Sequence, residues 1–248
     1  MLENTFIHIQ GIGAETEKSL WRKGIHKWED FLQSTDTLIS PRRDPLVRAQ
    51  VEDSIEHRND INFFYERLPV SELWRLFNRF GERAVYLDIE TGGAFYSGTD
   101  EITVIGLYDG RQIHTFVNGR NLEDFEAAIS LYDLVITFNG SCFDLPFIRR
   151  YFPGISLPRV HIDLRFFLKK LGVRGGLKAI EKEFGLLRNS EIDGMDGLDA
   201  IRLWNEYQWG DNKALELLIQ YNSADIKNLK PLMEMGYKMM KNRLLQKY

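Results

Sequence analysis

The chain has 248 residues, a formal net charge of −4, 44% hydrophobic residues and 27% charged residues. This composition is typical of a folded globular protein and excludes general disorder. The apolar runs are strand-sized and the first residues lack the pattern of a signal peptide, so we expect no membrane-spanning helix and no secretion. With one cysteine, Cys142, the chain cannot form an internal disulfide, and we expect a cytoplasmic protein.

The net charge leaves the substrate class open. Proteins that bind nucleic acid by bulk attraction are normally basic. Carboxylates gathered around metal ions, however, make the protein alone look acidic although the loaded site is not. A charge of −4 therefore neither supports nor excludes a nucleic-acid partner.

The sequence predicts a helical amino-terminal domain of residues 1–82. The apolar residues there mostly have helical spacing, whereas Thr5–Ile9 reads as extended and residues 34–44 read as a loop. The predicted helices are Ala14–Lys23, Pro45–Phe64 and Val70–Phe80.

After residue 82 the hydrophobic period becomes strand-like, and Asp109-Gly110 is a strong hairpin-turn signal. The predicted strands are Ala84–Glu90, Ile102–Tyr108, Gln112–Val117, Leu134–Phe138 and Arg159–Ile162. The predicted helices are Leu122–Leu131, Phe147–Tyr151, Leu164–Lys170, Leu177–Phe184, Ala200–Trp209 and Lys213–Leu229. A three-stranded meander followed by alternating helices and strands predicts an α/β fold for residues 83–248, with a mixed five-stranded sheet flanked by helices.

Two carboxylates lie on the first predicted strand. Side chains alternate across a strand, so Asp88 and Glu90 share one face, roughly 7 Å apart. Burying two carboxylates is costly unless a cation such as a metal ion neutralises them. Asp-x-Glu is a weak motif by itself, because Asp124 and Glu126 repeat it in a predicted surface helix. An exposed strand end is therefore an equal alternative for this pair.

A third aspartate follows the fourth predicted strand. Asp144 stands where this strand turns into a helix, at the end of the segment that begins at Asn139. There its carboxylate can face the open edge of the sheet. Two plainer interpretations stay open: Asp144 could cap the helix, and Asn139 with Gly140 could be turn formers. Asp163 ends the last predicted strand and opens the helix that follows it. Capping of that helix is the favoured interpretation, and a position near bound metal ions is the alternative.

The fourth carboxylate lies on the last predicted helix. Tyr221 and Asp225 are four residues apart and share one helix face with Leu218 and Leu229. An aspartate in the middle of an apolar face needs a partner. The helix setting therefore distinguishes this pair, although Tyr-x-x-x-Asp is a loose motif.

These residues form three motifs that follow one another along the chain. The chain carries Asp88-Ile-Glu90, Asn139 to Phe143-Asp144, and Tyr221-x-x-x-Asp225. The set resembles the three motifs of the DEDD 3′→5′ exonucleases, in the DEDDy branch that includes the proofreading domains of family-B DNA polymerases. The histidine branch would need a histidine at position 220, which is Gln220. The resemblance spans about residues 84–232, and residues 175–181 and 197–204 are more similar to the stand-alone prokaryotic exonucleases of the YprB type.

The resemblance implies a ribonuclease H-like fold and hydrolysis of nucleic acid from a 3′ end, slightly favouring DNA, with two divalent ions, Mg²⁺ or Mn²⁺. It implies that Asp88 bridges both ions. Glu90 and Asp225 would complete the coordination of one ion, and Asp144 would support the ligand shell of the other. Tyr221 would orient the attacking water, because a phenol with a pKa of about 10 is a poor base.

Further residues are candidates for substrate contacts. Asn139 and Phe143 belong to the second motif, whereas Gly11 and Gly13 precede a predicted helix in a segment that resembles half of a helix-hairpin-helix. Backbone N–H groups there could meet a phosphate, and a packing turn is an equal alternative. Contact with phosphates or a solvated face are equal alternatives for Lys169, Lys170, Arg174, Lys178 and Arg188.

Two other functions stay open. A ribonuclease H-fold endonuclease or resolvase could use the same carboxylates, but it does not need Tyr221 one turn before the last aspartate. A non-catalytic nucleic-acid-binding module would gain nothing from burying four carboxylates. Strand preference, pathway and oligomeric state do not follow from the sequence.

Overall fold

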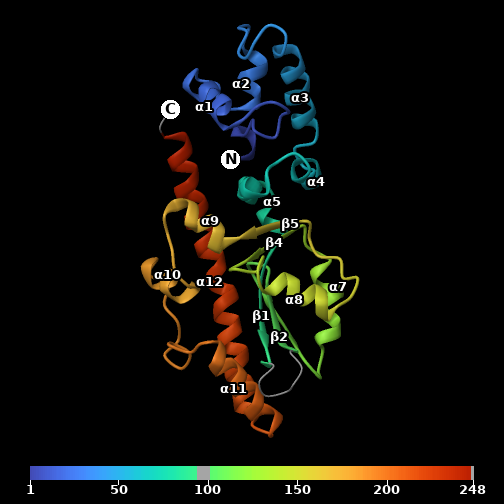
Figure 1. The fold of residues 1–248 in the computed structure, drawn as a ribbon, viewed down its shortest axis with the longest axis vertical. Helices are drawn as coiled ribbons and strands as arrows, with labels where there is room; N and C mark the ends of the chain where they lie inside the picture. The colour runs from blue at the N-terminus through green and yellow to red at the C-terminus, as the bar shows by residue number, and fades with distance from the viewer. Residues whose placement is uncertain (94–100, 247–248) are drawn as a thin grey trace. The chain divides into compact units, whose positions relative to one another are not determined.

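Two compact units make up the protein. The computed structural model describes residues 1–93 and 101–246. The first unit holds Met1–Gly81 and the end of the last helix from Tyr237 on, and the second holds Glu82–Gly236. The sequence predicts that this helix end belongs to the second domain. Figure 1 colours the first 81 residues blue to blue-green and the second unit green to red.

Short helices and turns form the first unit. Its elements are η1 Leu2–Asn4, α1 Ala14–Arg22, α2 Trp28–Gln33, α3 Asp44–Glu56, α4 Ile61–Tyr65, η2 Val70–Leu76 and α5 Phe77–Phe80, where η marks a 3₁₀ helix. The single helix predicted over Pro45–Phe64 is wrong, because the Asp60 carboxylate accepts from the Asn62 N–H at 2.9 Å and starts a new helix. The helix predicted over Val70–Phe80 is mostly 3₁₀. The segment predicted as extended, Thr5–Ile9, contains turns instead.

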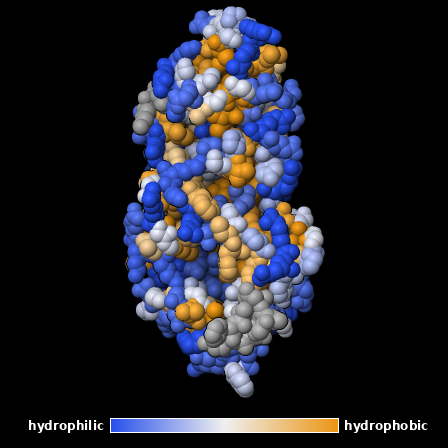
Figure 2. Space-filling model, viewed as in Figure 1, coloured by the Kyte–Doolittle hydropathy of each residue, from blue (hydrophilic) through white to orange (hydrophobic). Residues whose placement is uncertain are grey.

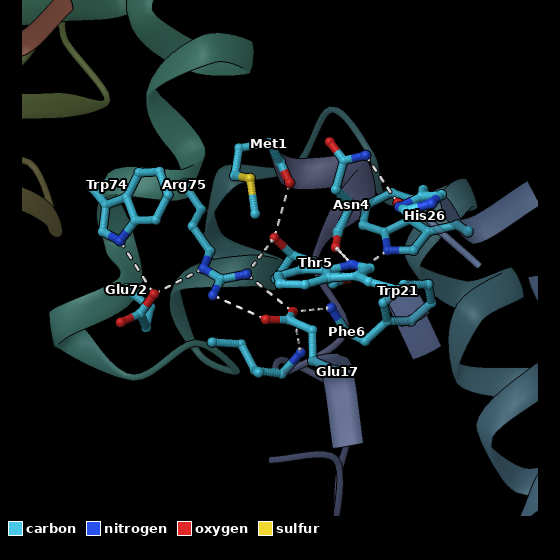
Figure 3. Close-up of polar contacts among 12 residues, drawn as sticks. Met1, Asn4, Thr5, Phe6, Glu17, Trp21, His26, Glu72, Trp74 and Arg75 are labelled. Carbon is cyan, nitrogen blue, oxygen red and sulfur yellow. Dashed lines mark hydrogen bonds and ion pairs between the residues drawn. The ribbon is translucent and has the colours of Figure 1, made fainter. Parts of the chain in front are cut away.

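A buried ion pair stabilises the first unit (Figure 3). Nη1 and Nη2 of Arg75 each lie 3.0 Å from a carboxylate oxygen of Glu17. These side chains are 4% and 2% exposed, respectively. Arg75 also donates to Glu72 and Thr5. Glu17 accepts from the Phe6 N–H at 2.7 Å, which takes up a backbone donor in the segment that the sequence predicts as extended.

A mixed five-stranded sheet forms the centre of the second unit, as predicted. Its strands are β1 Ala84–Thr91, β2 Ile102–Tyr108, β3 Ile113–Val117, β4 Leu134–Thr137 and β5 Val160–Asp163. The spatial order is β3-β2-β1-β4-β5. The first three strands in sequence pair antiparallel, and β4 is parallel to both β1 and β5. β1 therefore lies in the middle of the sheet.

Helices cover both faces of this sheet. They are η3 Gly81–Arg83, η4 Leu122–Asp124, α7 Phe125–Ile129, α8 Asp144–Tyr151, α9 Leu164–Leu171, α10 Leu177–Glu183, α11 Gly197–Gln208 and α12 Asn212–Leu245. Leu87 and Ile89 of β1 pack in one core with α7 and α8, whereas Val104 of β2 packs in a second core with α11 and α12. Figure 1 shows these helix pairs on opposite sides of the sheet. Because side chains alternate along β1, Asp88 and Glu90 face the α12 side.

The last helix is longer than predicted. The sequence predicts an end at Leu229, but α12 continues through Pro231 to Leu245. A proline inside a helix removes one intrahelical hydrogen bond. The fully buried Leu232 and Met233 follow the proline, and their burial in the core holds the helix beyond it.

The surface combines hydrophilic areas with isolated apolar side chains. Figure 2 shows, on the face in view, hydrophilic surface interrupted by hydrophobic areas. Trp209 and Leu187 are among the most exposed large apolar residues. Among the described residues, no helix has the length and apolar character that crossing a membrane requires.

Candidate active site

Three carboxylates from two elements converge beside the sheet. Asp88 and Glu90 project from β1, and Asp225 projects from α12. Oxygen atoms of the three carboxylates all lie within 4.8 Å of one another. Glu90 and Asp225 are 7% and 6% exposed, whereas Asp88 is partly exposed. Strand alternation and the sheet-facing side of α12 account for this meeting.

Asp144 lies at the edge of this cluster. It is the first residue of α8 and is buried. Its Oδ1 accepts a hydrogen bond from the Ile89 N–H at 3.1 Å, between the two acidic residues of β1. The amino terminus of α8 has no side-chain cap. The carboxylate also accepts from the N–H of Asp144 itself in the first turn of α8, so a bond at the start of the helix and the bond to β1 occur together.

Burial raises the pKa of all four carboxylates. Removal from water is the largest cause at each position. It raises the pKa of Asp144 to about 7 and that of Asp225 to about 6, although Arg188 acts in the opposite direction on Asp225. The pKa values of Asp88 and Glu90 rise well above their usual range, and neighbouring negative charges add to the effect. These charges therefore repel one another in a poorly hydrated site.

Arg188 is buried against one side of this cluster. It donates from Nη2 to Asp225 and, through Nε and Nη2, to both oxygens of Glu181 at 2.7 Å. Asn228 also donates to Glu181, at 3.0 Å. The Arg188 side chain is 3% exposed, so of the two interpretations from sequence the solvated face is wrong. The sequence gives only a weak indication of this burial, since Arg188 lies in a loop without hydrophobic periodicity.

Lys178 contacts the tyrosine of the site. Its Nζ donates to the Tyr221 hydroxyl at 2.9 Å and to the Met195 carbonyl, and it lies 4.7 Å from the centre of the Tyr221 ring. Burial, followed by the charges of Asp225 and Glu90, raises the pKa of Tyr221 above its ordinary value. A raised pKa favours the neutral hydroxyl of Tyr221 in the protein without bound cations.

Asn222 contacts the acidic cluster, although no motif in the sequence predicts this contact. Its Nδ2 donates to Asp88 Oδ2 at 3.0 Å, and its side chain is fully buried. This close approach of α12 to the sheet needs Gly106, which pairs with Asp88 across β1 and β2. A Cβ at Gly106 would lie 2.0 Å from Asn222 Oδ1. The signal in the sequence was the position of Asn222 directly after Tyr221.

The turn between β4 and α8 is held by Asp163. As predicted, Asp163 caps α9, accepting from the Arg165 N–H at 3.0 Å. It also accepts from the Asn139 and Ser141 N–H groups at 2.9 and 3.0 Å. Asn139 adopts a left-handed conformation with φ of 67°, and turn formation therefore explains at least part of its presence. Phe143, the other candidate of this motif, is 45% exposed.

Two candidates lie in the first unit. Gly13 precedes α1 as its cap residue, and the Gly11 carbonyl accepts from Arg43 Nη2 at 2.7 Å. Gly11 has a φ of 81°, which a glycine adopts without strain. Both the packing turn and the phosphate contact remain compatible with this geometry.

The donor set fits hard divalent cations. The converging side chains offer carboxylate oxygens, and neither cysteine nor histidine belongs to the described cluster around Asp88. Mg²⁺ and Mn²⁺ prefer such oxygen ligands. Only two cationic side chains, Lys178 and Arg188, are described above at this site. They are outnumbered by five carboxylates, those of Asp88, Glu90, Asp144, Asp225 and Glu181. A bound cation would offset this excess of buried negative charge.

A model of the RNase H superfamily matches residues 85–237, which is more than half of the chain. The chain belongs to the RNase H superfamily. The match begins in β1, the strand of Asp88 and Glu90, and includes the Tyr221–Asp225 part of α12. Together with the strand order, this assignment confirms the ribonuclease H-like fold predicted from the sequence.

Solved structures resemble parts of this RNase H superfamily chain at low identity. The family B DNA polymerase of the hyperthermophilic archaeon Pyrobaculum calidifontis is 18% identical, with a TM-score of 0.49 over 61% of this chain and 24% of the polymerase. Brucella melitensis NrnC is 19% identical, with a TM-score of 0.45, and the match covers 69% of this chain and 80% of NrnC. Escherichia coli RNase D, an exoribonuclease involved in structured RNA processing, is 20% identical. Its TM-score is 0.44, and the match covers 71% of this chain and 47% of RNase D.

The likeness is partial on both sides. The matched region corresponds to less than half of the polymerase and of RNase D. A comparison with curated protein sequences finds no match.

Proposed function

We propose that the protein is a metal-dependent 3′→5′ exonuclease of the DEDDy type, similar to the YprB-type enzymes, that hydrolyses phosphodiester bonds of nucleic acid. One observation carries the proposal. Oxygen atoms of Asp88, Glu90 and Asp225 lie within 4.8 Å of one another, and the side chains of Glu90 and Asp225 are buried. Such a cluster has no evident structural benefit, because burying like charges opposes folding.

The acidic residues would hold divalent cations, Mg²⁺ or Mn²⁺. Bound cations supply a Lewis acid that makes water nucleophilic near neutral pH and stabilises charge on the phosphate. Asp88, Glu90 and Asp225 offer converging oxygens, and Asp144 offers a further carboxylate at the edge. Asn222 fixes the Asp88 carboxylate through its amide, which leaves less freedom for the ligand to turn.

Tyr221 is proposed to orient the attacking water. Lys178 donates to the oxygen of the Tyr221 hydroxyl, so the hydroxyl proton is free to point toward a second acceptor. A fixed direction of this O–H bond is what a positioning group requires. An endonuclease with the same carboxylates does not require this tyrosine, and the presence of Tyr221 one turn before Asp225 therefore favours the exonuclease.

A directional cleavage assay tests this function. Purified protein with Mn²⁺ is incubated with single-stranded DNA and RNA labelled at the 5′ end, with either a free or a blocked 3′ terminus. We expect products that shorten stepwise from the free 3′ end and no products from the blocked strands. Internal cuts in the blocked strands would contradict the exonuclease and support the endonuclease. The ratio of DNA to RNA cleavage reports the preferred nucleic acid.

A further inference from the structure

A basic hollow opens beside the β4–α8 turn of the second unit. Its volume is about 730 Å³, within the range of about 300–1,000 Å³ for ligand sites. We define the basic hollow by the side chains Asn139, Arg165, Phe166, Lys169 and Arg174, with Gly175 and Gly176 contributing backbone to its wall. It lies between two segments that build the candidate active site: the turn leading to Asp144, and the loop leading into α10.

The charge of the basic hollow is opposite to that of the chain. The lining includes three cationic side chains, Arg165, Lys169 and Arg174, and among the described lining residues none is acidic. The chain as a whole has a net charge of −4. Lys169 and Arg174 are exposed, and neither has an ion-pair partner within the described part of the chain. These cations are therefore available for an anion.

The hollow also offers a flat apolar surface at a fixed position. Phe166 lies on α9 directly before the buried Phe167, yet it is 45% exposed. Arg165, the residue before it, donates from Nη1 to Asn139 Oδ1 at 2.6 Å, and Asn139 is held by Asp163 through its N–H. A cation fixed by hydrogen bonds loses little freedom when it binds an anion. A ligand with a phosphate and a planar apolar ring fits this combination of groups.

We propose that the basic hollow binds one nucleotide of a single-stranded substrate next to the bond that is cleaved. The phosphate would lie against Lys169 and Arg174, and the base would stack on Phe166. In a duplex the faces of each base are covered by the neighbouring base pairs, so an unpaired nucleotide is the one that can stack on Phe166, and single-stranded ends are the substrate class that fits. This inference rests on the proposed nuclease function, because the nucleotide in the hollow would belong to the strand that is cleaved.

Binding without cleavage tests the hollow separately from catalysis. Fluorescence anisotropy in EDTA would follow a labelled oligothymidylate of about ten nucleotides, within the usual span of single-strand sites. We expect Lys169→Ala/Arg174→Ala to weaken binding about tenfold and to reduce the salt dependence of log affinity by about 0.7 per lost phosphate contact. The matched control is Lys227→Ala/Arg111→Ala, which removes two exposed cations outside the hollow and should bind like the parent.

A second pair of variants tests the stacking surface. Phe166→Ala should weaken binding about tenfold, whereas Phe166→Leu, which keeps an apolar side chain without a flat ring, should recover little of the loss. Equal binding by the parent, the hollow variants and the control would overturn the proposal, as would a parent that binds no oligonucleotide at low salt. If the parent cleaves while the hollow variants bind normally, the hollow fails and the nuclease stands. If the hollow variants lose binding but no protein cleaves, the nuclease fails and the hollow stands.

Discussion

Arg188 donates from Nη2 to the Asp225 carboxylate while it pairs with both oxygens of Glu181. One buried cation thus serves two buried carboxylates, and one of them belongs to the proposed metal site. Arginine suits this place because its planar guanidinium offers several donors in fixed directions. Its buried Nη1 has no hydrogen-bond partner among the described residues, so the contacts to the acids use Nε and Nη2 alone.

Removal of Arg188 should destabilise the protein most when no divalent metal is present. Arg188→Met leaves Glu181 and Asp225 buried without a counter-charge, and we expect a loss of about 3–5 kcal/mol in the free energy of unfolding in EDTA. Mn²⁺ should recover part of this loss, since it binds the folded protein through Asp225. Denaturant unfolding with and without Mn²⁺ measures both effects. Equal stability of variant and parent in EDTA would contradict the role of Arg188 in neutralising these acids.

Tyr221→Phe should separate water orientation from metal binding. The substitution keeps the buried ring and removes the hydroxyl that accepts from Lys178. We expect turnover to fall about 10²- to 10⁴-fold, the usual contribution of a positioned group, while Mn²⁺ affinity changes little. Asp225→Asn should lose both rate and metal. Single-turnover cleavage and calorimetric Mn²⁺ titration measure the two quantities.

Tyr207→Phe is the matched control for the tyrosine. It removes a hydroxyl that accepts from Arg120 at 3.1 Å on the surface. This variant should cut like the parent. If Tyr221→Phe also cuts at the parental rate, Tyr221 contributes to packing alone.

The raised pKa of Asp144 predicts a pH dependence of stability. The folded protein keeps this proton up to about pH 7, whereas the unfolded chain releases it near the ordinary value of 3.8. The folded state binds more protons between these values, so this group lowers the free energy of unfolding as pH rises from about 4 to 7. In EDTA, the parent should therefore lose more stability than Asp144→Asn over this interval. Denaturation curves at several pH values test the difference; identical slopes would contradict it.

Gly106→Ala should disturb the contact between α12 and the sheet. The new Cβ would lie 2.0 Å from Asn222 Oδ1 and 2.9 Å from Ile226 Cδ1. We expect a loss of about 1–3 kcal/mol in stability and weaker Mn²⁺ binding, because Asn222 would leave Asp88. Adding Asn222→Ala should recover part of the stability but not the metal affinity. Gly197→Ala, where a Cβ meets no atom within 4 Å, is the control.

The sequence predicts those parts of the fold that depend on local periods. Alternation along β1 predicts that Asp88 and Glu90 share a face, and the five strands occur close to their predicted positions. The helical spacing of Tyr221 and Asp225 likewise places both on one side of α12. These predictions succeed because a strand or helix direction is fixed by a few neighbouring residues.

Features that depend on distant contacts are not predictable in this way. Arg188 lies in a loop, and its partners come from α10 and α12, so no local pattern marks it as buried. The continuation of α12 past Pro231 depends on the core that receives Leu232 and Met233. The fit of Asn222 above the sheet depends on a glycine, Gly106, more than one hundred residues earlier in the chain. In each case tertiary packing outweighs local propensity.

The most direct test of the metal-dependent nuclease is cleavage of a 5′-labelled single strand by the parent and Asp88→Asn in Mn²⁺. The neutral amide is a poor ligand for a hard cation, so we expect the variant to lose nearly all activity while its fold is retained. The matched control Asp124→Asn alters the exposed Asp-x-Glu repeat and should cut normally. Parental cleavage by Asp88→Asn, or full activity of the parent in EDTA, would contradict the account.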